Sequence, residues 1–298
     1  DDLAFLGDCL QREEPDRSIL WIVSWGFDVP KLIRRLRGHR VAYHAHSSGY
    51  GFDLPAGVPV LAVSRNTLGY WGARAPRIPL CLVPNALADP WLERGARGKE
   101  GVRSIDVLVQ ARKSSPYVLN QLVPALQRAG LKVEVQSGWV DDLVELFNQS
   151  TVYLYDSADY WRGRGVTEGF GLPPLEALAC GCVVFSSLNH ALADHGDPCR
   201  TVHQIGCGRL GFDVHRIQSA VRNPSQWRPQ ADQLEADLAP YTEPRLLESW
   251  RQALKHLDAL DALQGPSLVN PATWQLRWRQ RLQRVRRVVD RLPGWPAT

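Results

Sequence analysis

The chain has 298 residues, of which 44% are apolar and 22% are charged, so it can fill one large or two modest globular cores. Its net charge of +4 is local, because the seven Arg and one Asp of residues 274–298 carry +6 and leave about −2 for residues 1–273. A protein that binds nucleic acid spreads Lys and Arg over its domain among exposed aromatic residues, and the lack of that pattern excludes this class.

Residues 19–84 predict a first set of strands. Short apolar, β-branched runs bounded by turn residues indicate strands at 19–24, 40–45, 59–64 and 80–84. The pattern of 31–38 predicts a helix that ends at Gly38. Residues 88–104 follow, and their polar, unpatterned sequence predicts a linker.

A second and fuller set of elements follows the linker. Its predicted strands cover 105–110, 132–136, 151–155 and 182–186. Its predicted helices lie around 116–129, 140–149, 174–180 and 244–264. Because alternating strands and helices are typical of parallel sheets, we predict an α/β protein with two Rossmann-like domains, 1–88 and 89–264, and a tail, 265–298. The first domain is short for a doubly wound sheet.

A glycine-rich loop joins the strand at 151–155 to a helix that we predict to begin near Pro173. The loop contains Glu168, and Glu176 falls in the predicted first helical turn. Glycines let the backbone approach a ligand, and the free N–H groups at a helix start favour an anion such as a diphosphate. Carboxylates accept hydrogen bonds from sugar or ribose hydroxyls. The alternative is an ordinary turn followed by a Glu that compensates the helix dipole.

The string E-G-F-G-L-P-P-L-E-A-L-A-C-G at 168–181 resembles the Glu-x7-Glu signature of retaining glycosyltransferases of family 4. The resemblance covers most of residues 19–260 and implies the GT-B architecture of two facing Rossmann-like domains, here with the N-terminal one shortened. It implies that Glu168 contacts the donor sugar and that Glu176 holds the nucleotide ribose. The backbone amides that it assigns to the diphosphate are those of Gly169, Phe170, Gly171 and Leu172.

Further site residues follow from the same resemblance. Arg112 matches the family's Arg, which faces the negative charge of the leaving diphosphate. Lys113 is a second candidate, although the family carries its Lys farther along the chain. His44 resembles the family's His beside the donor sugar, with His46 as the next candidate. Residues 64–66, Ser-Arg-Asn, are candidates for lining the cleft.

The implied enzyme is a retaining, hexosyltransferase-type glycosyltransferase. It would move a sugar from a UDP- or GDP-linked donor to a glycan or lipid-linked acceptor in cell-envelope or exopolysaccharide synthesis. The sequence has no Asp-x-Asp motif, so we expect no metal and no cofactor besides the nucleotide-sugar co-substrate. The short first domain supports an alternative, a non-catalytic nucleotide-sugar-binding or partner subunit without a complete acceptor domain. A sugar-nucleotide epimerase is disfavoured, because the Glu-x7-Glu segment belongs to transferases.

The tail carries apolar residues at three- and four-residue steps over 274–292, among many Arg. Such a helix either lies on an anionic membrane surface or packs its apolar stripe on the enzyme. No apolar run approaches the roughly 20 residues that span a membrane, and no signal sequence is present. The six Cys form no Cys-x-x-Cys pair, which favours reduced thiols. We therefore expect a cytoplasmic protein, peripheral on the inner membrane face if the tail binds lipid.

Overall fold

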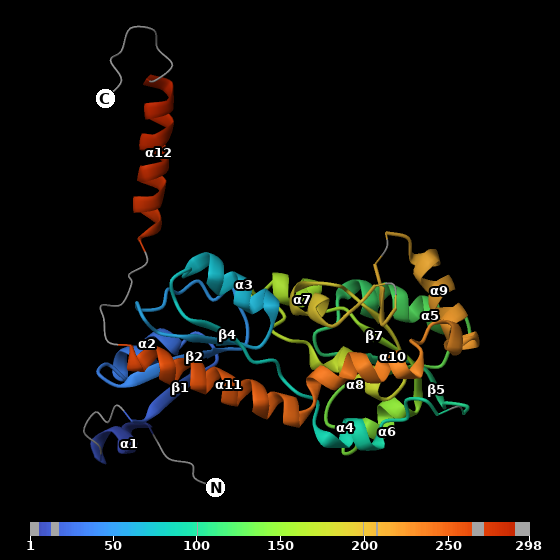
Figure 1. Ribbon diagram of the computed structural model, residues 1–298. Helices are drawn as coiled ribbons and strands as arrows, with labels where there is room; N and C mark the ends of the chain where they lie inside the picture. Colours follow the sequence, from blue (N-terminus) through green and yellow to red (C-terminus); the bar gives the residue numbers. More distant parts are fainter. Residues whose placement is uncertain are drawn as a thin grey trace.

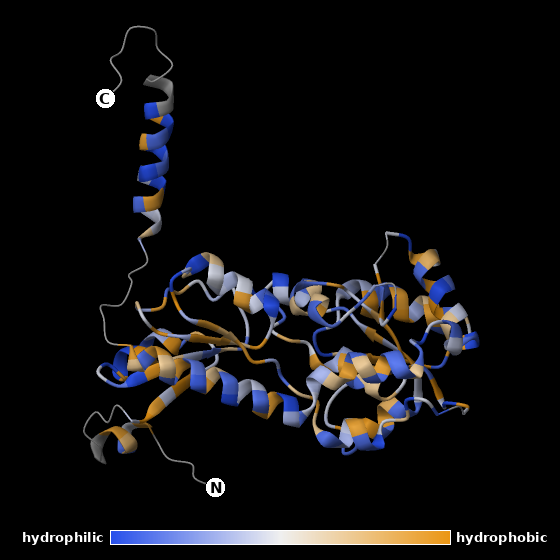
Figure 2. Cartoon of the chain, viewed as in Figure 1, coloured by the Kyte–Doolittle hydropathy of each residue, from blue (hydrophilic) through white to orange (hydrophobic). Residues whose placement is uncertain are grey.

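The computed structural model describes residues 6–12, 18–99, 101–198, 200–206, 208–263 and 271–289. They form two parallel β-sheets that lie side by side, with helices packed against both (Figure 1). Apolar side chains gather on the strands and on the helix faces that cover them, whereas the outward helix faces are polar (Figure 2). Each sheet therefore has a hydrophobic core of its own.

The first sheet has four parallel strands in the order β1-β2-β3-β4. These strands are β1 (Leu20–Ser24), β2 (Arg40–Ala45), β3 (Val60–Ala62) and β4 (Leu80–Leu82). The helices of this part are α1 (Leu6–Arg12), α2 (Val29–Arg35) and α3 (Arg65–Arg74). One face of the sheet buries Tyr43 and Trp71 in an aromatic core. Ser64 caps α3, because its side chain accepts a hydrogen bond from the Thr67 amide.

The second sheet has five parallel strands in the order β6-β5-β7-β8-β9. These strands are β5 (Ile105–Gln110), β6 (Val133–Gln136), β7 (Ser150–Tyr155), β8 (Val183–Ser186) and β9 (Val202–Gln204). Every residue of the central strand β7 is buried, as expected for a parallel strand covered on both faces. The second sheet thus supplies the larger of the two cores.

Further helices lie between the strands or follow β9. They are α4 (Asp89–Arg94), the π-helical turn η1 (Val118–Leu122), α5 (Val123–Arg128), α6 (Leu143–Asn148), α7 (Ala158–Arg162), α8 (Leu172–Ala179), the 3-10 turns η2 (His190–Asp194), η3 (Pro224–Gln226) and η4 (Ala239–Tyr241), α9 (Leu210–Arg222) and α10 (Ala231–Leu238). Helix α4 lies inside the segment 88–104 that the sequence predicts to be a linker, and it packs on α6 and α8. The segment between the sheets is therefore partly structured.

The long helix α11 (Glu243–Ala262) returns from the second sheet to the first (Figure 1). Its Ala253 and Leu257 are buried against residues of β2 and β3. Arg40 of β2 forms ion pairs with Asp258 and Asp261 of the same helix. Helix α11, which the sequence places in the second domain, thus completes the core of the first sheet.

The last described helix, α12 (Thr273–Val289), stands away from both sheets (Figure 1). Its Trp274 and Trp278 are 68% and 58% exposed. The sequence allows this helix either to lie on a membrane surface or to pack on the enzyme. Among the described residues, it does not pack on either sheet. Within the described part of the chain, every helix is too short or too polar to cross a bilayer.

Candidate functional site

The order of strands in the second sheet indicates where a ligand can bind. Strand β5 has β6 on one side and β7 on the other, so the connections that follow β5 and β6 run in opposite directions along the sheet. In open parallel sheets, ligands bind beyond the carboxyl ends of the strands at such a switch point. Arg112 and Lys113 follow β5, and Tyr155 ends β7, so these side chains meet at that edge.

A pocket of about 600 Å³ occupies this edge. Its walls come from the segments after β5 and β6, from the end of β7 and from the start of α8. They include Arg112, Lys113, Trp139, Tyr155 and Pro173. The Trp139 side chain is 90% exposed, and its indole N–H donates a hydrogen bond to Asp141 at 2.9 Å. A pocket of this size, with one exposed aromatic ring and two cations, suits a charged small molecule that carries a flat ring.

Glu168 contacts two residues of the pocket wall, Tyr155 and Lys113, and is only 4% exposed. Its Oε2 accepts hydrogen bonds from the Tyr155 hydroxyl and the Trp161 indole N–H, both at 2.6 Å. Its Oε1 lies 3.4 Å from the Lys113 ammonium, which also stands 4.7 Å from the centre of the Trp161 ring. The structure therefore joins two residues, Glu168 and Lys113, that are 55 positions apart in the sequence.

The loop after Glu168 presents backbone N–H groups. Gly171 has a φ of 84°, a left-handed conformation that Gly adopts readily, and it forms the N-cap of α8. Among the described residues, the amides of 169–172 donate no backbone hydrogen bond. Pro173 and Pro174 occupy the first turn and have no N–H group. The N–H groups that this helix start can offer to an anion are therefore the loop amides that precede the prolines.

Glu176 lies one turn into α8. Helix α8 begins at Leu172, so the predicted start near Pro173 is nearly right, but its first turn holds no acidic residue. Burial raises the pKa of Glu176 to about 7. Burial, and after it the charge of Glu176, raise the pKa of Tyr153. The Tyr153 hydroxyl donates a hydrogen bond to Gln110 on the pocket wall. A carboxyl group in this state accepts hydrogen bonds when ionised and can donate one when protonated.

The candidate histidines lie on the first sheet. The His44 ring packs 4.1 Å from His46 and 5.0 Å from Trp250 of α11, measured between ring centres. Burial, reinforced by His46, lowers the pKa of His44 to about 4, so the ring is neutral near pH 7. Its Nε2 is buried, and no hydrogen-bond partner reaches it within the described chain. His44 therefore lies behind His46 as seen from the second sheet.

The two sheets meet across these loops. A Cβ placed on Gly169 would overlap the carbonyl oxygen of His46, so only glycine allows this approach. Ser48 and Thr167 form three hydrogen bonds: between their hydroxyls at 2.7 Å, from the Thr167 amide to the Ser48 carbonyl at 3.1 Å, and from the Ser48 amide to the Thr167 hydroxyl at 3.2 Å. The Arg65 amide donates to Asp194 at 2.6 Å. The segment 64–66, a sequence candidate for cleft lining, thus lies where the two halves touch.

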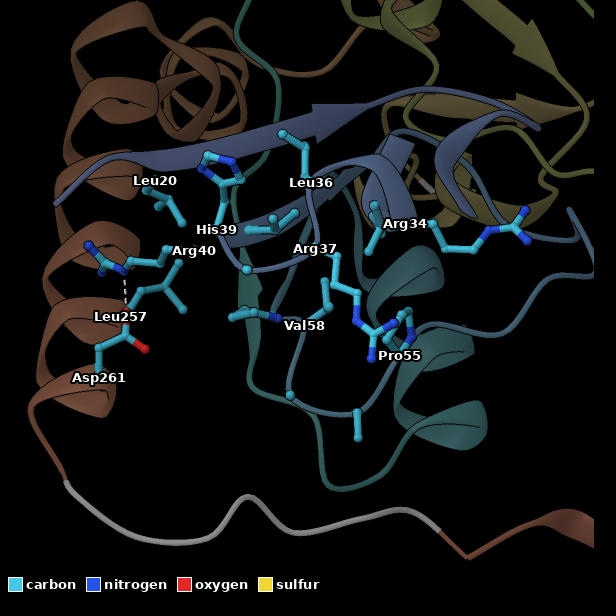
Figure 3. Close-up of a pocket in the computed structure, with 16 residues that line it drawn as sticks. Leu20, Arg34, Leu36, Arg37, His39, Arg40, Pro55, Val58, Leu257 and Asp261 are labelled. Carbon is cyan, nitrogen blue, oxygen red and sulfur yellow. Dashed lines mark hydrogen bonds and ion pairs between the residues drawn. The ribbon is translucent and has the colours of Figure 1, made fainter. Parts of the chain in front are cut away.

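A second pocket, of about 540 Å³, lies at the opposite ends of the first-sheet strands (Figure 3). Leu20, Val58 and Leu257 form its apolar part, and Arg34 and Arg37 lie at its rim. Since catalytic groups of parallel sheets gather at the carboxyl ends of strands, this pocket belongs to a different face from the site above. Among the described residues, no three His, Cys, Asp or Glu side chains gather as they would around a metal ion.

Residues 124–194 match the family Glycosyl transferases group 1. The matched segment contains the whole loop from Gly163 to Leu172 and the helix α8 that follows it. The match does not include the first sheet, nor Arg112 and Lys113, which come directly after β5. Comparison with curated protein sequences gave no match.

Solved structures resemble most of the chain. Sucrose-phosphate synthase from Thermosynechococcus elongatus superposes with a TM-score of 0.58 at 15% identity, over 81% of this chain and 74% of that one. HepE from Anabaena, in complex with UDP-glucose, superposes with a TM-score of 0.56 at 14% identity, over 80% of this chain and 78% of HepE. A glycosyltransferase from Rickettsia africae superposes with a TM-score of 0.57 at 13% identity, over 79% of this chain and 77% of that one.

The chain has the GT-B fold. The predicted α/β class with two facing Rossmann-like domains is therefore confirmed, and the first sheet is the smaller one, with four strands against five. In this GT-B frame the sequence candidates divide into two groups. Glu168, Arg112 and Lys113 gather around one pocket, whereas His44 lies in the other half of the molecule.

Several residues of the site carry no sequence signal of their own. Tyr155 and Trp161 hold the Glu168 carboxylate, and the His190 ring accepts a hydrogen bond from the Glu168 amide. Tyr155 ends a predicted strand, and this position could have indicated that it belongs to the site. Trp161 and His190 come from connections whose path the sequence does not predict.

Proposed function

We propose that this chain is a glycosyltransferase that takes its sugar from a nucleoside-diphosphate donor bound at the switch point of the second sheet. The observation that carries the proposal is the loop of residues 168–172. Among the described residues, the amides of 169–172 donate no backbone hydrogen bond, and Lys113 and Arg112 line a pocket together with Pro173, which follows the loop. Two cations and a set of available N–H groups provide the charge that a diphosphate requires.

The rest of the pocket suits the other parts of such a donor. Trp139 offers an exposed ring on which a nucleobase can stack. Glu176 and its neighbours are candidates for the ribose, and Glu168 Oε1 is the candidate acceptor for a hydroxyl of the sugar. The structure of HepE was solved with UDP-glucose, so a UDP-sugar is the first donor to test. A GDP-sugar is the second.

We propose that transfer proceeds with retention and without a metal. Lys113, Arg112 and the loop amides would stabilise the charge that develops on the leaving diphosphate. His44, through its neighbour His46, is proposed to face the donor sugar from the first sheet. Activity that persists in EDTA, with a product of unchanged anomeric configuration, would support both parts. Loss of activity in EDTA or an inverted product would contradict them.

Helix α12 supports a membrane-surface location and hence an acceptor in cell-envelope or exopolysaccharide synthesis. It contains six Arg and no acidic residue, and its exposed Trp274, Trp278, Leu282 and Val285 recur at three- and four-residue steps. Such a helix lies in the interface of an anionic bilayer. Sedimentation with anionic liposomes should fall when the chain is ended at residue 270. Unchanged binding would remove this part of the proposal.

The competing function is a nucleotide-sugar-binding partner subunit without activity of its own. Its supporting observation is the smaller first sheet of four strands. Hydrolysis or transfer of UDP- and GDP-sugars by the purified chain separates the two functions. We expect slow donor hydrolysis that Glu168→Ala lowers about 100-fold or more, because a group that acts on the donor sugar is lost. Donor binding without any turnover would favour the partner subunit.

A further inference from the structure

Two aromatic side chains lie exposed where strand β1 ends. Trp25 is 66% exposed and Phe27 is 70% exposed, although rings of this size are usually buried. They precede α2, at the carboxyl edge of the first sheet that faces the second sheet. Exposed aromatic rings at the edge of a ligand cleft indicate a binding surface.

The Trp25 ring is held in a fixed orientation. It stacks on the His46 ring with 4.6 Å between centres and 15° between planes. One face of the indole is therefore covered by His46, while the large exposed fraction leaves the other face open to solvent.

The backbone at Trp25 is also unusual. Trp25 has a φ of 67°, and Gly26 after it has a φ of 70°. A left-handed conformation is costly for a bulky residue, and such strain persists where it positions a functional group. The strain turns the chain sharply at the end of β1 and leaves the Trp25 ring exposed against His46.

His46 connects this ring to the donor loop. Its carbonyl oxygen lies against Gly169, the residue next to Glu168. The open face of Trp25 is thus separated from the loop that we assign to the donor by a single residue of the first sheet. Ser24 and Asp28, close to Trp25 in the chain, are exposed as well. A flat, open aromatic face matches a pyranose, which has C–H groups on its faces and hydroxyls on its rim.

We propose that the open face of Trp25, stacked on His46, binds a sugar ring of the acceptor. The assignment rests on the proposed glycosyltransferase function and adds the acceptor class, a glycan or glycoside. Burial lowers the pKa of His46, so its ring is neutral near pH 7 and can both donate and accept a hydrogen bond at the edge of the platform.

The test uses octyl glycosides of glucose, galactose, mannose and N-acetylglucosamine, below their micelle concentrations, with the full chain and saturating UDP. Saturation-transfer NMR reports separately on the protons of the sugar ring and of the octyl chain. The variant is Trp25→Gly, which removes the ring and tolerates a φ of 67°. The matched control is Trp274→Gly, because Trp274 is 68% exposed but lies on α12.

We expect at least one glycoside to receive saturation mainly at its sugar-ring protons. Trp25→Gly should weaken that binding about fivefold or more, whereas Trp274→Gly should leave it unchanged. Equal binding by wild type and Trp25→Gly would overturn the assignment. So would a loss confined to the octyl protons, or no glycoside signal while UDP binds. If neither UDP nor GDP binds, the donor proposal itself fails, and that result is read independently of the glycosides.

Discussion

The two halves of the molecule present different kinds of groups where they meet. The side on the second sheet consists of backbone amides at 169–172, the buried Glu168 and the charges of Lys113 and Arg112. The side on the first sheet consists of rings, with Trp25, His46 and His44 in contact one after another. A backbone site needs Gly and Pro at fixed places, so it leaves a sequence motif. Ring stacking tolerates many residue orders, so it leaves none.

The largest effect is expected where the two sides touch. Gly169→Ala places a methyl group against the His46 carbonyl, so the sheets must move apart. A small misplacement of reacting groups costs about 100-fold, and transfer should fall by that factor while UDP still binds the second sheet. Steady-state kinetics and calorimetry with UDP measure the two quantities.

A control for this variant lies in the same loop. A methyl group at Gly163 would meet Asp159 at 3.4 Å, an ordinary contact, so Gly163→Ala should keep both transfer and binding. If Gly169→Ala retains full transfer, the close approach of the two halves plays no part in the reaction.

The next largest effect shows which of the two cations on the second sheet, Lys113 or Arg112, contributes more to the binding of UDP. Lys113→Ala should weaken binding of UDP about 10- to 150-fold, because a charged hydrogen bond is worth about 1.5 to 3 kcal/mol. Arg112→Ala should cost less, because Arg112 is exposed whereas Lys113 is held by Glu168 and Trp161. Calorimetry at low and high salt measures both, and exposed Lys132→Ala serves as the control. A larger loss for Arg112→Ala would reverse the order.

The smallest effect concerns the proton on Glu176. Because burial raises its pKa to about 7 from an ordinary value of 4.5, the folded chain holds this proton more tightly than the unfolded chain. The contribution to stability is present below pH 4.5 and is lost as the pH rises through about 7. From pH 5 to pH 8, the unliganded wild type should therefore lose on the order of 1 kcal/mol relative to Glu176→Gln.

Thermal unfolding of both proteins at the two pH values checks this difference. UDP binding at pH 8 should be about threefold weaker in Glu176→Gln, since a neutral amide replaces a carboxylate. Exposed Glu134→Gln should show neither effect. Identical pH profiles for wild type and Glu176→Gln would contradict the buried, proton-holding carboxyl group.

The sequence predicts all four strands of the first sheet and four of the five strands of the second. The central residues of the run 105–110, at 107–109, are all apolar because both faces of the strand are covered, and this strand has the predicted ends. Strand β9 has only three residues, and helices α3, α9 and α10 carry weaker patterns, so the sequence does not predict them. The course of α11 onto the first sheet depends on contacts between distant residues, which no local pattern contains.

The candidate site divides in the same way. Glu168 and the glycines around it stand in one contiguous string, so the sequence alone indicates them. Its partners Tyr155 and Trp161 act through side chains brought together by the fold. Lys113 is adjacent to Arg112, unlike the family spacing, yet a φ of 71° turns its side chain to Glu168. Backbone conformation of that kind cannot be read from residue types.

The central claim is that the loop at 168–172 binds the diphosphate of a nucleotide donor. Calorimetric titration of the full chain with UDP and with uridine, and with GDP and guanosine, tests it most directly. We predict that one nucleoside diphosphate binds about 100-fold more tightly than its nucleoside, because the amides, Lys113 and Arg112 act only on the phosphates. Equal affinity of diphosphate and nucleoside, or no binding of either diphosphate, would contradict the claim.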